Sequence, residues 1–207
     1  MLYSYVVTRD YGFAPNPFGG CCTLATCKPQ IRKKATVGDW IIGTGSNSKK
    51  CNMGNRLIYA MRVDETMNLD TYWNDSRYQD KKPVMNGSKR QKYGDNIYYF
   101  DETQNKFVQV NSHHSLDDGT TNENNYSRDI SGRNALISRY FWYFGDRAPE
   151  IPEKLVPFIV KNGIGHRIVK EEEIIASFSA WLIENHKPGY IGMPCFFKRN
   201  FERYNGN

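Results

Sequence analysis

The segment VGDWIIGTGS (residues 37–46) decides how the fold is organised. Its first three residues predict a turn, and residues 40–43 predict a short buried strand directly after that turn. The small residues 43–46 let a ligand or another backbone come close, and their N–H groups are open to an anion. The segment therefore predicts a buried strand that ends at a place suited to ligand binding.

Working outward from this strand, the pattern alternates between strands, loops and a few helices. Residues 2–8 (LYSYVVT) predict a first strand, and residues 9–20 (RDYGFAPNPFGG) predict a shaped loop because glycine and proline exclude a regular element. A helix is expected to begin near Pro29. Further strands are expected at 56–63, 96–100, 106–110 and 134–144, and further helices at 69–78 and 170–186. The stretch 79–95 is expected to be a loop, 111–133 a long polar loop that is functional or disordered, 152–162 a short helix or strand, and the tail after 194 an edge segment.

These elements predict an α+β fold, with a mixed, curved sheet or small barrel flanked by two or three helices. The sequence shows no internal repeat and no domain-scale linker. We therefore expect residues 1–207 to form a single domain, with a core over about 1–145 and a C-terminal helical extension over 146–207.

Composition narrows the class of protein. Five cysteines, Cys21, Cys22, Cys27, Cys51 and Cys195, are an odd number whose spacing matches no zinc template, so we expect free thiols and no metal site. The sequence has no Walker loop and no complete dinucleotide fingerprint, so no cofactor is predicted. No apolar run reaches the length of a membrane span, and no signal peptide is recognised, which together favour a cytoplasmic location without membrane contact.

The charge of the chain favours an anionic partner. Twenty-eight Lys and Arg residues outnumber 22 Asp and Glu, which gives a formal net charge of +6. This excess suits nucleic acid, although a solubility charge would look the same. The basic residues form three separated clusters, which fit a folded surface better than a disordered arm: Lys28, Arg32, Lys33 and Lys34; Lys49, Lys50 and Arg56; and Lys81, Lys82, Lys89, Arg90 and Lys92.

The order of a strand, a glycine-rich loop, a basic helix and then VGDWIIGTGS resembles the opening of PUA-like domains such as the EVE, ASCH and YTH modules. The resemblance implies a pseudo-barrel with a pocket for a single flipped or free base, often a modified one. Such a base needs aromatic faces for stacking and polar groups for its pairing edge. Tyr5, Tyr11, Phe13, Trp40 and Ser46 are suitable residue types, although Tyr5 and Trp40 could equally be core.

A second resemblance covers nearly the whole chain. Several motifs recur in order, namely TRDYGFAPNPFGGCCTLATCKP, VGDWIIGTGS, RLIYAMRV, GDNIYYFDETQNKFVQVNSHHSL and ALISRYFWYFGDRAPEIPE. Together they resemble the second type of nucleotide-modification-associated domain, a family found mainly in phages and bacteria. The resemblance implies a link to DNA base hypermodification or to systems that counter it.

The pair His113-His114 is the main candidate for chemistry, because histidine suits proton transfer near neutral pH. Adjacent residues of an extended chain point to opposite sides, so only one of the two is expected to face a given pocket. A metal bound by one histidine with Asp117 or Asp118, and a purely structural loop, are the alternatives.

Three hypotheses follow. The leading one is a binding protein for a nucleotide or nucleic acid that recognises a modified base in an aromatic pocket. The residues expected to contact the nucleotide are Arg9, Tyr11, Phe13, Lys28, Arg32, Trp40, Thr44 and Ser46. The second is an enzyme that alters or removes a base group, with His113 or His114 as acid or base and Asp10 as a partner. The third is a phage-encoded interaction module that blocks or assists a phage or host modification enzyme.

Overall fold

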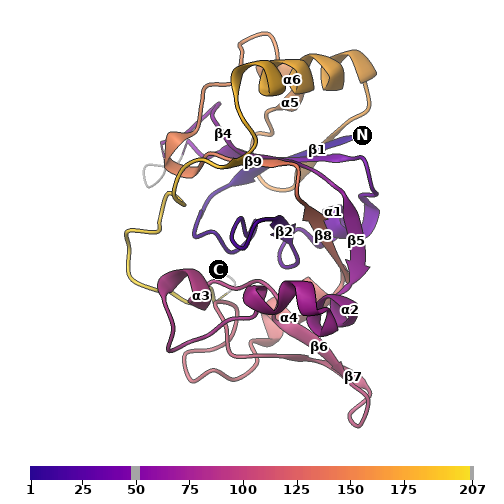
Figure 1. The fold of residues 1–207 in the computed structure, drawn as a ribbon, viewed down its shortest axis with the longest axis vertical. Coiled ribbons are helices and arrows are strands. Elements are labelled where there is room, and N and C mark those ends of the chain that lie inside the picture. Colours follow the sequence, from indigo (N-terminus) through magenta and orange to yellow (C-terminus); the bar gives the residue numbers. More distant parts are fainter. Residues whose placement is uncertain (48–51, 206–207) are drawn as a thin grey trace.

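The computed structural model describes residues 1–47 and 52–205 and is built around a six-stranded mixed sheet (Figure 1). The strand order is β10-β1-β3-β4-β9-β11. The strands are β1 (Leu2–Val7), β3 (Trp40–Gly45), β4 (Leu57–Arg62), β9 (Phe141–Tyr143), β10 (His166–Val169) and β11 (Gly189–Tyr190). β1 runs parallel to β3 and antiparallel to β10. β3 pairs antiparallel with β4, and β4 pairs antiparallel with β9. The central strands are almost entirely buried, because both faces of the sheet are covered.

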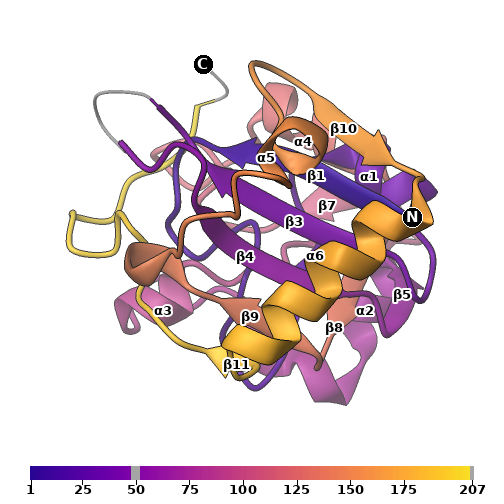
Figure 2. The same ribbon diagram turned by 90° about the horizontal axis from the view of Figure 1, so that it is seen from above.

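Helix α6 (Glu172–Asn185) covers one face of this sheet and crosses its strands diagonally (Figure 2). Its residues Phe178 and Leu182 are fully buried in the main apolar core. The ring of Phe178 meets that of Trp40 edge to face, with centroids 5.8 Å apart. The buried apolar side chains of α6 thus form the contact between helix and sheet.

The other face is covered by the loop after β1 and by a three-stranded sheet of β2 (Cys22–Leu24), β8 (Asn134–Ser138) and β5 (Glu65–Asn68). Beyond it lie α2 (Leu69–Asn74), α3 (Lys89–Lys92), α4 (Glu123–Ile130) and the hairpin of β6 (Tyr98–Asp101) and β7 (Lys106–Gln109), which form the lower part of the view in Figure 1. The remaining elements are α1 (Pro29–Lys34), α5 (Val156–Ile159) and the 3-10 turns at Ser76–Lys81 and Gly145–Arg147. A second apolar cluster, rich in tyrosine, fills this layer.

The α+β class is confirmed, as are the first strand, the helix at Pro29, the hairpin at 96–110 and the C-terminal helix. No sheet closes into a barrel within 1–47 and 52–205, and more than three helices are present. The segment 146–207 supplies β10, which pairs with β1, so this segment belongs to the main sheet. Residues 195–205, which the structure describes, form turns and irregular backbone but no strand, so the expected edge segment is not found there.

Three predicted elements are corrected by the structure. The stretch 79–95, expected to be a loop, contains the short helix α3. The polar stretch 111–133 contains α4, which Asn122 caps by accepting hydrogen bonds from the N–H groups of residues 124 and 125. The expected strand 134–144 is two strands in different sheets. The break lies at Arg139, where the Asp64 carboxylate accepts the backbone N–H and turns the chain. Apolar periodicity could not reveal this break, because both halves are buried.

None of the helices that the structure describes is long and apolar enough to cross a membrane.

Candidate functional site

A cavity of about 600 Å³ opens beside the end of β1. Its walls come from segments that are far apart in the sequence: the end of β1 with the following loop, residues 27–30 at the start of α1, the pair at 113–114, Arg128 on α4, the start of β10 and Tyr204. Its volume lies within the range of small-molecule pockets, about 300–1,000 Å³.

Six of the residues expected to act in binding or catalysis line this cavity. They are Arg9, Tyr11, Phe13, Lys28, His113 and His114. The loop at 9–20 therefore forms part of the cavity wall. Its backbone is irregular, as its glycine and proline content predicted.

Three of the expected nucleotide contacts, Trp40, Thr44 and Ser46, do not line this cavity. Trp40 is only 6% exposed and packs in the core under α6. The Thr44 hydroxyl is buried in β3 and donates to the Tyr5 carbonyl. The strand β3 of the segment 37–46 thus belongs to the core of the fold and not to the wall of this cavity. Lys49, Lys50 and Cys51 lie outside the described residues.

Arg32 is buried and serves the local backbone, which corrects the expectation that it contacts a nucleotide. Its guanidinium donates to the carbonyl oxygens of residues 27, 129, 132 and 134. These bonds tie α1 to α4 and to the start of β8. The Arg32 guanidinium therefore stabilises the fold and does not face the cavity.

Asp10 is buried with structural partners, which corrects its assignment as a partner of the histidines. It accepts hydrogen bonds from the Tyr143 hydroxyl and from the backbone N–H groups of Cys195 and Gly12. Burial raises the pKa of Asp10, although these donors oppose the shift. It anchors the loop after β1 to β9 and to the C-terminal tail.

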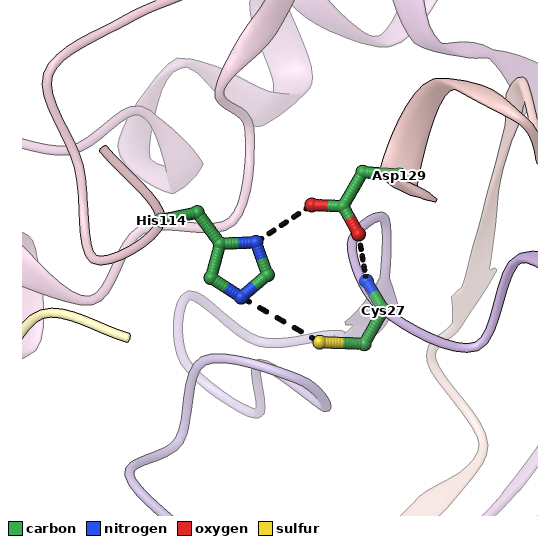
Figure 3. A group of neighbouring side chains, drawn as sticks. All are labelled: Cys27, His114 and Asp129. Atoms are coloured by element: carbon green, nitrogen blue, oxygen red, sulfur yellow. Dashed lines mark hydrogen bonds and ion pairs between the residues drawn. The ribbon is translucent and has the colours of Figure 1, made fainter. Parts of the chain in front are cut away.

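The chemically distinctive feature of the cavity is a chain of three side chains, Cys27, His114 and Asp129 (Figure 3). Nδ1 of His114 donates to Oδ2 of Asp129 over 2.6 Å, and Nε2 lies 3.6 Å from the Cys27 sulfur. His114 and Asp129 are 1% and 0% exposed, whereas Cys27 is half-buried at the cavity wall. The imidazole therefore connects a buried carboxylate to a thiol that the cavity can reach.

Asp129, near the end of α4, holds both other members of this chain. Its second oxygen, Oδ1, accepts the backbone N–H of Cys27 over 2.8 Å, while Oδ2 also accepts the Tyr98 hydroxyl over 3.0 Å. Burial alone would raise the pKa of Asp129, but the charge and hydrogen bond of His114, assisted by Arg32, hold it below its usual value. The carboxylate is therefore ionised and fully engaged.

The backbone at Cys27 and Lys28 is unusual. Both residues have a positive φ, 55° and 39°, in the left-handed region that non-glycine residues seldom adopt. The conformation is fixed from both sides, because Asp129 accepts the N–H of Cys27 and Arg32 donates to its carbonyl over 2.7 Å. Such backbone outliers concentrate at functional sites.

The two neighbouring histidines have opposite protonation behaviour. Burial lowers the pKa of His114, but the Asp129 charge outweighs burial and raises it to about 9. Burial, followed by the charge of His114, lowers the pKa of His113 to about 3. At neutral pH the first is therefore an imidazolium and the second a neutral ring.

His113 packs among aromatic rings rather than beside a carboxylate. Its ring lies 4.8 Å from that of Phe13 and 5.2 Å from those of Tyr11 and Tyr93, between centroids. Its Nδ1 donates to the backbone carbonyl of Glu202. The expectation that only one of the two histidines faces a given pocket is wrong, because the chain turns at residues 113–114 and both side chains line the cavity. Of the two, His114 is the one that contacts a carboxylate.

By distance alone, Cys27, His114 and Asp129 are also the group of described residues that could hold a metal ion, with ligand atoms within 4.8 Å of one another. The orientation of the imidazole opposes this reading. Its two nitrogens point in opposite directions, one to the carboxylate and one to the sulfur, and a single ion would bind only one of them (Figure 3). Asp117 is fully exposed and Asp118 accepts hydrogen bonds from Thr120, so neither joins the histidines.

The rest of the wall combines positive charge with aromatic rings. The Lys28 ammonium lies 4.5 Å from the centroid of the Tyr5 ring. The guanidinium carbons of Arg9 and Arg128 lie 5.0 Å and 5.3 Å from the centroid of Tyr204. These contacts are in the range of cation–π interactions and hold the cations at the cavity.

Sequence reasoning missed Cys27, Asp129, Arg128 and Tyr204 as site residues. Only Cys27 carried a local signal, because it lies two residues before the proline that begins a helix. The others lie in a polar stretch and in the tail, and tertiary folding alone brings them to the cavity.

Comparisons with known proteins give one match. The sequence model described as nucleotide modification associated domain 2 matches residues 1–201. No curated protein and no solved structure matches the chain.

Proposed function

Because the chain belongs to the family of nucleotide modification associated domain 2, we propose that its cavity binds a nucleotide, free or within a nucleic acid, and alters a group on it. The family indicates a role connected with nucleotide modification. The proposal adds the place of binding and the kind of chemistry.

The walls of the cavity support binding of a nucleotide. Lys28 and Arg128 are cations suited to phosphate, and Arg9 lies beside the same tyrosine ring as Arg128. Tyr11 and Phe13 present aromatic rings at the wall, and stacking on such rings is worth about 1–3 kcal/mol per base. A modified base would find room in a cavity of about 600 Å³.

One observation carries the proposal from binding to catalysis: His114 links a buried carboxylate to a thiol at the wall of this cavity. Recognition of a base does not require a buried imidazolium beside a thiol. Such an arrangement suits proton transfer, because Asp129 fixes the orientation of the imidazole and stabilises its charged form. In this arrangement His114 acts as the acid and base, and His113 forms part of the aromatic wall.

A binding protein without turnover is the second candidate, and the aromatic wall of Tyr11, Phe13 and His113 favours it. Both candidates bind a nucleotide, and they differ in whether the nucleotide changes. An interaction module for a phage or host modification enzyme would do neither, and would instead co-purify with a protein partner.

The test combines thermal shift with mass spectrometry over a panel of ordinary and modified nucleotides and oligonucleotides. The proposal predicts a stabilising ligand that also changes mass. His114→Gln should bind the same ligand and form no product, while the matched control His186→Gln, whose ring packs against Phe144 away from the cavity, should keep turnover. Circular dichroism checks that both variants fold.

If a nucleotide binds and its mass does not change, the recognition function stands and the proposed catalysis is wrong. Product formation by His114→Gln at the wild-type rate would also refute the assigned proton transfer. If no nucleotide raises the melting temperature of the wild-type protein, both the proposed binding and the proposed catalysis are wrong.

A further inference from the structure

Cys27 has the surroundings of a nucleophile, a role that goes beyond proton transfer by His114. Its sulfur lies at the cavity wall, 3.6 Å from an imidazole nitrogen whose other nitrogen is held by a buried carboxylate. A nucleophile, a base and a group that orients the base are the three parts of a catalytic triad, whatever the fold that carries them.

Building on the proposed function, we propose that Cys27 attacks the carbonyl carbon of an amide or ester carried by a nucleotide substrate and forms a thioester with it. His114 supplies and removes the proton, and Asp129 is the positioning residue. The reaction class is hydrolysis of an acyl group from a nucleotide.

The other described cysteines lack this environment. Cys21 and Cys22 are buried, and burial raises the pKa of both thiols. Cys195 is half-buried, and its backbone N–H serves Asp10. Among the described cysteines, Cys27 alone lines the cavity, where its sulfur contacts His114.

The geometry between nucleophile and base is set by a single carboxylate. Asp129 accepts the backbone N–H of Cys27 with one oxygen and the imidazole N–H with the other (Figure 3). Any shift of the carboxylate would move both partners, so the sulfur–nitrogen distance is held by two bonds from one rigid group. The left-handed backbone at 27–28, fixed by Arg32 as well, aims the thiol at the cavity. Catalysis depends on this kind of fixed orientation.

The position of the imidazole indicates which reaction the thiol performs. A relay of this kind first holds the thiol proton and then returns a proton to a leaving group, which is the sequence of events in acyl transfer. Addition of a thiol to a base ring, with no leaving group, would not use the second event.

The proton and electron balance closes with water as the only co-reactant. In the first half-reaction the Cys27 proton resides on Nε2 of His114, the sulfur bonds to the carbonyl carbon, and the carbonyl π electrons move to oxygen. On collapse the carbon–nitrogen or carbon–oxygen bond breaks, and the leaving group takes that electron pair and the proton from Nε2. In the second half-reaction water gives a proton to Nε2 as its oxygen bonds to the carbon, and the carbon–sulfur bond breaks to restore the thiolate.

The experiment uses p-nitrophenyl acetate as an acyl donor with the full chain, in the presence of EDTA. We expect a burst of one p-nitrophenolate per chain and an acetyl group on the peptide that contains Cys27, released by hydroxylamine as a thioester is. Cys27→Ala should abolish both signals. His114→Gln should lower the burst rate at pH 7 on the order of 10²-fold, the scale of general acid–base catalysis. Cys195→Ser, the matched control, should keep the full burst.

Three outcomes would overturn the proposal: no acetyl group on Cys27 of the wild-type protein, an unchanged burst rate in His114→Gln, or a burst that requires added Zn²⁺. These results are separable from those on the proposed function. Nucleotide turnover that persists in Cys27→Ala and still depends on His114 would keep the proposed enzyme and remove the covalent intermediate.

Discussion

The opposite protonation of two adjacent histidines leads to a prediction about stability as a function of pH. His113 has a folded pKa of about 3, because burial excludes its charge, against about 6.5 in an unfolded chain. Its contribution to stability is complete above pH 6.5 and is lost as the pH falls. Between pH 8 and pH 5 this loss amounts to about 2 kcal/mol in the free energy of unfolding.

His114 acts in the other direction. Its folded pKa of about 9 lies above the unfolded value, because Asp129 stabilises the imidazolium. Its contribution is fully present below pH 6.5 and is lost as the pH rises through 9. Lowering the pH from 8 to 5 therefore gains about 2 kcal/mol, which offsets the loss from His113.

The wild-type protein should accordingly show little change in stability from these two residues between pH 8 and pH 5. In His113→Gln the loss from His113 is removed and the gain from His114 remains. When the pH is lowered from 8 to 5, the free energy of unfolding of this variant should therefore rise by about 2 kcal/mol more than that of the wild type. Urea titrations at both pH values, followed by tryptophan fluorescence, measure the difference. His186→Gln is the control, because burial lowers the pKa of this half-buried histidine less than that of His113, so its profile should change less.

Direct observation of the imidazole nitrogens by NMR tests the same reasoning. His113 should remain neutral from pH 8 to pH 5, and His114 should remain protonated at pH 7. A His113 that titrates near 6.5, or a His113→Gln variant with the wild-type pH profile, would refute the assignment of charge within the site.

Three further predictions concern residues that the sequence placed at a site and the structure places in the fold. Asp10→Asn should lower the free energy of unfolding by about 1–3 kcal/mol, because the Tyr143 hydroxyl and two N–H groups lose a carboxyl acceptor, while nucleotide affinity stays unchanged in a binding titration. Arg32→Lys should destabilise the protein and slow acylation of Cys27, since an ammonium cannot replace the planar fork that bonds four carbonyls; normal acylation kinetics would count against its role in positioning the thiol. Trp40→Ala should cost about 3–5 kcal/mol in a denaturation experiment and leave the affinity of the folded protein as it was, because the ring packs under α6.

Local sequence features predicted much of the fold. Residues 2–8 are rich in aromatic and β-branched residues and the helix at 170–186 has apolar periodicity, and the structure confirms both elements. The break after Ser138 escaped prediction because it depends on the distant Asp64 carboxylate, which no local pattern reveals. Helix α4 escaped prediction because its residues are polar, so it lacks the apolar stripe by which helices are recognised.

The site divides in the same way. His113 and His114 were conspicuous as a pair, and the loop residues Tyr11 and Phe13 stood out among glycines and prolines. Asp129 is one acid within a polar stretch, and only the packing of α4 brings it to His114. Trp40 was misplaced because an aromatic residue at the start of a strand looks the same in a core and in a pocket.

The double role of Asp129 has a consequence for the evolution of the family. Because one carboxylate fixes both the thiol backbone and the imidazole, a lineage that loses it gains little by keeping the other two. Positions 27, 114 and 129 should therefore be retained or replaced as a set among relatives, while the cationic and aromatic wall changes independently. Relatives with the complete set would be the enzymes, and those that lost it together would have become receptors that only hold a base.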